Sequence, residues 1–162
     1  MKTGLQFFGL GLACLLIFLS GCVATSNPLA GNTVSSVPVV ALKSGGPHAD
    51  SWQTFDILIE YIYTQDGNLF KISGSALLSE HYQMLYTRLR DLKIYFFFLD
   101  KNSRVLAGHL LAQSLLNDID QRLPFNRSYD LPPGTDRISF GYNGRVSEME
   151  DLKTFYRLPL TK

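Results

Sequence analysis

Cysteine is scarce in this chain, and its position limits the chemistry available. The two cysteines, Cys14 and Cys22, both fall within the first 22 of the 162 residues. The rest of the chain therefore lacks the thiols that a disulfide, a thiolate metal site or a cysteine nucleophile requires. A domain of this size can be held by its hydrophobic core alone, so the absence of disulfides does not argue against export.

An excess of charge of either sign is also missing. Fifteen basic residues face fourteen acidic ones, for a formal net charge of +1. Loss of Lys2 with an export signal would bring the net charge to zero. This balance offers no electrostatic argument for binding nucleic acid or a strongly charged substrate. The hydrophobic share of 46% and the aromatic share of 12% are ample for a folded core, which excludes global disorder.

The amino-terminal segment has the pattern of an export signal. Lys2 precedes an apolar run over residues 5–19. That run is shorter than the ~20 residues of a lasting transmembrane helix. Leu19-Ser20-Gly21-Cys22 follows at once and resembles the lipobox of bacterial lipoproteins, which has a hydrophobic residue, two small residues and cysteine. The alternatives are an uncleaved anchor, or an ordinary signal peptide with an incidental cysteine.

The lipobox resemblance implies how the chain is processed and where it resides. Signal peptidase would cut between Gly21 and Cys22, and the Cys22 thiol would carry the diacylglycerol. Each buried CH₂ of the fatty acyl (palmitate-like) chains contributes ~0.8 kcal/mol, so several chains make a stable membrane anchor. Val23 stands where an aspartate would direct inner-membrane retention. An outer-membrane lipoprotein facing the periplasm is therefore expected.

Three segments are expected along the chain. Residues 1–21 are the signal peptide, residues 22–51 are the lipidated cysteine and a flexible tether, and residues 52–160 are one folded domain. The tether is rich in Ser, Thr, Asn, Pro and Gly, and Ser44-Gly45-Gly46-Pro47 is a strong structure breaker. The alternative is that residues 37–42 form an edge strand of the domain.

A hairpin is the best-supported local structure. Apolar residues alternate along residues 55–63, which is the period of a strand, and Asp66-Gly67 predicts a two-residue type I′ turn. Pairing across that turn places Tyr63 opposite Phe70 and Tyr61 opposite Ile72. It also places Ile59 opposite Gly74 and Ile57 opposite Ala76, and one face becomes apolar throughout.

Further strands are predicted downstream. Residues 92–98 alternate as a central strand, and residues 100–104 turn it back through a three-residue loop. That loop places Phe98 opposite Leu106 and Ile94 opposite Leu110. Residues 110–119 fit either strand or helix, and residues 79–90 either a short helix or a crossing loop. Residues 136–142 read as another strand, with Asn143-Gly144 as a turn after it.

Short strands with regular turn signals and no long helix predict an all-β fold. We expect an antiparallel β-sandwich that resembles immunoglobulin-like or fibronectin-like modules in its pattern of strands. Fold does not fix function, however.

No catalytic or metal-binding motif stands out. Residues 72–76 (Ile-Ser-Gly-Ser-Ala) differ from the Gly-x-Ser-x-Gly elbow and fall within a predicted strand. The histidines, His48, His81 and His109, have no i, i+4 partner for zinc, and the neighbours Glu80 and His81 are a weak base-and-orienter pair. The acidic residues at 118, 120 and 148–151 lack the glycine-centred loop of a calcium site. No cofactor or metal is expected.

One cluster interleaves aromatic and basic residues: Tyr82, Tyr86, Arg88 and Arg90. This composition is favoured at protein interfaces. The alternative is that these residues cap one end of the sandwich. The absence of net charge and the envelope location argue against a nucleic-acid partner.

The sequence therefore predicts a non-enzymatic, membrane-tethered interaction module of the cell envelope with an unidentified protein partner. The alternative is a small carrier or chaperone for an apolar ligand, with Phe96, Phe98, Phe140 and Tyr142 around a cavity. A hydrolase would need a convergent polar cleft, for which the sequence gives no sign.

Overall fold

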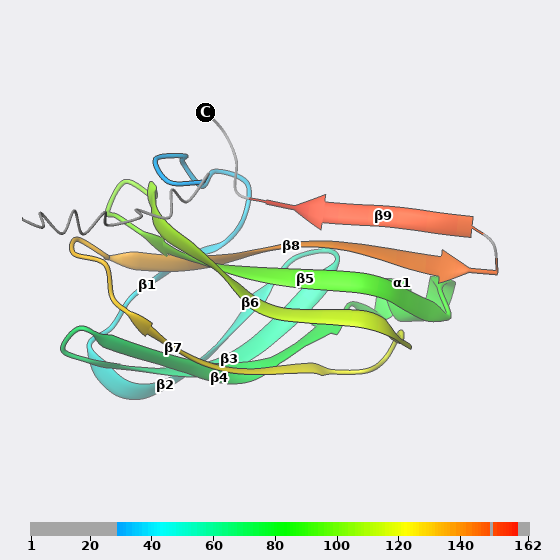
Figure 1. Cartoon of the computed structure of the whole chain (residues 1–162), viewed down its shortest axis with the longest axis horizontal. Helices are drawn as coiled ribbons and strands as arrows, with labels where there is room; N and C mark the ends of the chain where they lie inside the picture. The colour runs from blue at the N-terminus through cyan, green and yellow to red at the C-terminus, as the bar shows by residue number, and fades with distance from the viewer. Residues whose placement is uncertain (1–28, 150, 159–162) are drawn as a thin grey trace, which may run out of the picture.

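Alternating apolar residues fold this chain into strands, and the strands form two antiparallel sheets (Figure 1). The computed structural model describes residues 29–149 and 151–158. The elements in chain order are β1 (Val39–Ala41), β2 (Gly45–Gln53), β3 (Ile57–Asp66), β4 (Leu69–Leu78), α1 (Glu80–Leu85), β5 (Arg88–Leu99), β6 (Val105–Asp118), β7 (Leu123–Asp130), β8 (Arg137–Glu148) and β9 (Asp151–Arg157).

The two sheets face each other as a sandwich, which confirms the predicted fold class. One sheet has the order β2-β3-β4-β7. The other has the order β1-β8-β5-β6, and β9 also pairs with β8. β1 pairs with residues 137–139 of β8 and β9 with residues 142–148, so these two strands share one edge of β8. β4 and β7 are neighbours, as are β5 and β8, so the chain crosses repeatedly between the sheets.

The interior between the sheets is filled by aromatic rings. Phe70 stacks on Phe96 with ring centroids 5.4 Å apart, and Phe96 lies 4.9 Å from Phe98 and 5.3 Å from Phe140. Pairs of this geometry contribute ~0.5–1.5 kcal/mol beyond their area burial. The stacked rings bind the two sheets together.

The predicted tether over residues 22–51 is wrong for most of the part that the structure describes. β1 and most of β2 fall within it, and both are strands of the sandwich. The alternative, an edge strand within residues 37–42, is correct. Residues before β1 also belong to the fold, because Val34 and Val37 are buried and the backbone N–H of Val34 donates to the carbonyl of Ser103 at 2.8 Å.

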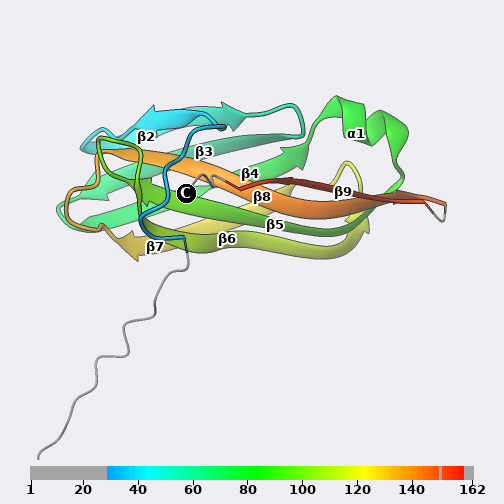
Figure 2. The same ribbon diagram turned by 90° about the horizontal axis from the view of Figure 1, so that it is seen from above.

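Residues 29–38 cover the outer face of the β8-β5-β6 sheet (blue in Figure 2). Phe97 and Leu99 of β5 are fully buried although their neighbours Phe96 and Phe98 point into the sandwich. Successive side chains of a strand point to opposite faces, so both faces of β5 are covered at this point. The amino-terminal segment is therefore a third, partial layer of the core.

The β3–β4 hairpin forms, but its register differs from the prediction by two residues. Tyr63 lies opposite Ile72, and Asp66 opposite Leu69, so Gly67 and Asn68 are the central turn residues. Only Gly67 of the two has positive φ, which is the pattern of a type II′ turn and not type I′. A shift of two residues keeps every side chain on its predicted face, so the apolar face is as expected.

The β5–β6 turn confirms the three-residue loop, but the pairing beyond it is wrong. The amide of Asp100 donates to the carbonyl of Arg104 at 3.0 Å. Two register shifts then follow, so that Phe98 faces Ala107 and Ile94 faces Ala112. A bulge inserts one extra residue and turns the following side chains to the other face. As a result Leu110 is exposed and His109 points inward.

The structure decides three other local predictions. Asn143-Gly144 is not a turn but lies inside β8, where Asn143 pairs with Lys93 of β5 and Tyr156 of β9. The glycine leaves room for the Phe155 ring, whose nearest atom is 2.6 Å from the place of a Cβ. Residues 79–90 split into α1 and the start of β5. Residues 110–118 continue the strand β6.

Candidate functional site

The predicted lipidation site, with cleavage between Gly21 and Cys22, lies outside the described residues. Within residues 29–149 and 151–158, no helix has the length and apolar character needed to span a membrane.

The predicted interface cluster is divided by the fold. Tyr82 is buried, with its ring 5.7 Å from that of Tyr86 and 4.9 Å from that of Phe155. Burial, followed by a hydrogen bond to Asp56, raises the pKa of the Tyr82 hydroxyl. Tyr82 therefore caps the end of the core, which is the alternative that the sequence left open.

The two arginines of that cluster remain near the surface. Arg88 is exposed at the start of β5. Arg90 is half-buried, and its Nε donates a 2.7 Å hydrogen bond to Ser147 Oγ. An interface at this end would thus use Arg88 and the rim of Tyr86, and would leave Tyr82 covered.

A polar cluster that the sequence did not reveal lies beneath the same end. The Tyr142 hydroxyl donates to Asp56 Oδ2 and lies 3.0 Å from Thr54 Oγ1. Burial raises the pKa of the Tyr142 hydroxyl, and the Asp56 carboxylate raises it further. The cluster ties the β2–β3 loop to β8 in the opposite sheet. Asp56 falls within the strand predicted over residues 55–63, on its polar face, so no pattern in the sequence pointed to this role.

Four large apolar side chains of the loops and the helix at the α1 end project into solvent. The exposed fractions are 65% for Phe55, 81% for Met84, 47% for Leu85 and 88% for Met149. They come from the β2–β3 loop, α1 and the β8–β9 turn, which lie toward the same end of the sandwich with α1 between the other two (Figures 1 and 2). We call this set the apolar tip. Exposed apolar groups gathered in one place are typical of interaction surfaces.

The three histidines come from different elements of the fold, and each one contacts an aromatic ring. His48 lies 5.1 Å from Tyr63, His81 lies 4.9 Å from Phe55, and His109 stacks on Tyr129 at 4.4 Å. Burial lowers the pKa of His109. Among the described residues no three His, Cys, Asp or Glu side chains lie close enough to hold a metal ion.

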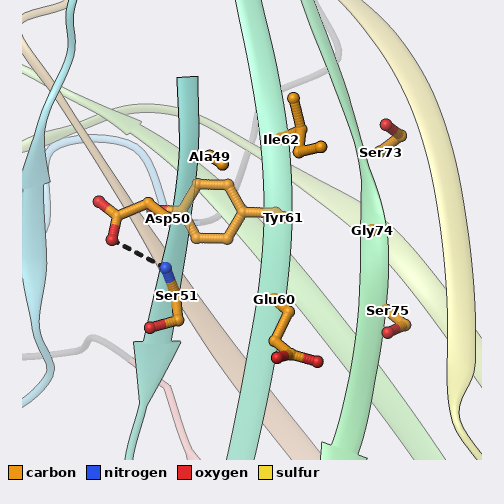
Figure 3. A pocket seen from close by; sticks show the side chains of 9 residues that line it. All are labelled: Ala49, Asp50, Ser51, Glu60, Tyr61, Ile62, Ser73, Gly74 and Ser75. Atoms are coloured by element: carbon orange, nitrogen blue, oxygen red, sulfur yellow. Dashed lines mark hydrogen bonds between the residues drawn. The ribbon is translucent and has the colours of Figure 1, made fainter. Parts of the chain in front are cut away.

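A shallow hollow of about 610 Å³ lies over β2, β3 and β4 (Figure 3). Small side chains surround it, and Ile62 and Glu60 of β3 stand beside Ser73 and Ser75 of β4. Glu60 is paired with Arg122 from the β6–β7 loop. Arg122 also donates a 3.2 Å hydrogen bond to Ser75 Oγ, so one arginine holds both the Glu60 carboxylate and the Ser75 hydroxyl at the edge of an open sheet surface.

The four aromatic residues expected around a ligand cavity are packed as core. Phe96, Phe98, Phe140 and Tyr142 are completely buried. None of them lines the hollow of Figure 3, nor the smaller ones beside α1 and between β1 and β2.

The comparisons with known proteins do not extend this picture. No protein-family model, curated protein or solved structure matches the chain. The class that can be stated is the one its own residues define, an antiparallel β-sandwich.

Proposed function

We propose that the protein is a lipid-anchored, non-enzymatic interaction module of the cell envelope, which presents the apolar tip to a protein partner. The tip carries this proposal. Its four side chains lie on the loops and the short helix at one end of the sandwich, and the buried Tyr82 ties that helix to the core. Burying one such side chain in an interface contributes ~1.5–3 kcal/mol, which makes the cluster suited to a protein surface.

The anchor in this proposal rests on the lipobox at residues 19–22 and on the apolar run before it. Cys22→Ala should abolish metabolic labelling with a fatty acid and release the protein from the membrane fraction. Undiminished label on the alanine variant would overturn the lipoprotein assignment. An outer-membrane, periplasm-facing position follows from Val23 and is tested by fractionation of the two membranes.

The interaction role is tested by crosslinking in intact cells from a photoreactive group at Leu85. We expect a discrete adduct that the double variant Phe55→Ser/Met84→Ser loses. Ile62→Ser, which removes an exposed apolar side chain from the hollow of Figure 3, is the matched control and should leave the adduct unchanged. Equal adducts from all three proteins would refute the tip as the binding surface.

A further inference from the structure

The fold sets an upper limit on the distance between the β-sandwich and a lipid attached at Cys22. The backbone N–H of Gly31 donates to the carbonyl of Val105 at 2.9 Å, and the N–H of Val105 donates to the carbonyl of Asn32 at 2.8 Å. This pins the chain to the first residue of β6. Nine Cα–Cα steps separate Cys22 from Gly31, and a fully extended chain of that length spans at most about 32 Å. If Cys22 carries the lipid, as proposed above, the start of β6 cannot lie farther than that from the bilayer.

The apolar tip lies at the other end of the same strand. β6 has 14 residues, which extend over roughly 45 Å at 3.2–3.4 Å per residue. Its last residue, Asp118, pairs with Arg88 directly after α1. The chain thus enters the fold at one end of the sandwich, and the tip is at the end opposite to it (Figure 1).

The α1 end carries exposed charges of both signs. Its carboxylates are Glu80, Asp118, Asp120, Glu148 and Asp151, and its cations are Arg88, Arg122, Arg145 and Lys153.

At the β5–β6 turn Lys101 and Arg104 are exposed, and the exposed Asp136 beside them is paired with Arg137. The Asp100 carboxylate there is engaged by the backbone N–H groups of Asn102 and Arg104 at 2.8 and 2.9 Å. A membrane surface with anionic headgroups attracts each nearby Lys or Arg by about 1 kcal/mol and repels carboxylates.

We propose that the protein stands upright on its membrane, with the β5–β6 turn against the lipid headgroups and the apolar tip directed away from them. The occupant of the turn surface is an anionic bilayer, and Lys101 and Arg104 contact its phosphates. This orientation rests on the proposed lipid anchor, and it explains how a domain held so close to a membrane keeps its apolar end free for a protein.

Two single-cysteine variants measure the orientation in the full lipidated protein. Asn102→Cys places a donor fluorophore in the β5–β6 turn, and Met84→Cys places one at the tip. Cys22 is consumed by the lipid and does not compete for label. In vesicles of mixed zwitterionic and anionic phospholipid with headgroup acceptors, energy transfer from position 102 should exceed that from 84 on the order of tenfold, because roughly 40 Å of strand separates the positions.

Two controls separate the possible outcomes. Inserting roughly twenty Gly and Ser residues after Val23 lengthens the reach and should reduce the contrast. In that lengthened protein, Lys101→Glu/Arg104→Glu should reduce the difference in energy transfer between positions 102 and 84 further in anionic vesicles. The same substitutions should change the difference little in neutral vesicles. Equal transfer from both positions in vesicle-bound protein overturns the upright orientation. Failure of the unaltered protein to bind vesicles overturns the lipid anchor instead.

Discussion

Replacing Val34 and Val37 by alanine tests whether the amino-terminal segment is part of the fold or a tether. Both side chains are buried against the outer face of the β8-β5-β6 sheet. Each substitution removes two methyl groups, at ~0.8 kcal/mol per buried carbon. The double variant should therefore lose about 3 kcal/mol, with some coupling since the sites are close. A tether would lose nothing.

Urea unfolding of the Val34→Ala/Val37→Ala double variant measures the difference. With slopes of ~1–3 kcal/mol per molar, a loss of that size lowers the midpoint by roughly 1–3 M. Ser36→Ala, an exposed position between the two valines, is the matched control and should keep its midpoint. Identical midpoints for all three proteins would refute the account of residues 29–38 as a layer of the core.

Three further changes probe the packing inside the sandwich. Gly144→Val should cost ~1–3 kcal/mol in unfolding experiments, because its Cβ would meet the Phe155 ring at 2.6 Å. Tyr142→Phe should cost about 1.5 kcal/mol, since it removes the hydrogen bond to the Asp56 carboxylate. Burial lowers the pKa of His109 in the folded state from its ordinary value of 6.5. The free energy of unfolding should therefore fall as the pH drops below 6.5, because the unfolded chain then binds the proton more readily. His109→Gln should weaken that dependence, and an unchanged profile would contradict the burial of a neutral imidazole.

Side-chain periodicity explains which sequence predictions survive. The β3–β4 register is displaced by two residues, yet the period of a strand is also two, so Tyr61 and Tyr63 remain on the buried face. The bulges in β6 add single residues, and each one reverses the faces beyond it. The one local sign of a bulge in residues 105–112 is the isolated Gly108. It does not indicate that a bulge lies on each side of it, which is why His109 and Leu110 were assigned to the wrong sides.

The sequence contains a sign of the additional layer formed by residues 29–38, although the alternation of residues 92–98 drew attention away from it. Residues 94–99 form an unbroken apolar run, Ile-Tyr-Phe-Phe-Phe-Leu, which indicates a strand covered on both faces. What covers the second face could not be read from the sequence. Val34 and Val37 lie three residues apart among polar neighbours, which gives no strand or helix pattern. Their burial follows only from the path of the chain across β5.

The same crossing ties the amino-terminal segment of the described chain to both sheets. The carbonyl of Pro38 accepts a 2.8 Å hydrogen bond from Trp52 Nε1 of β2 and a 2.7 Å hydrogen bond from Ser139 Oγ of β8. These strands belong to opposite sheets, and Trp52 and Ser139 are both buried. Pro38 therefore closes the flank of the sandwich at the place where the chain arrives. In the proposed lipoprotein, residues 23–28 would be all that separates the lipid from a segment, residues 29–38, that both sheets hold.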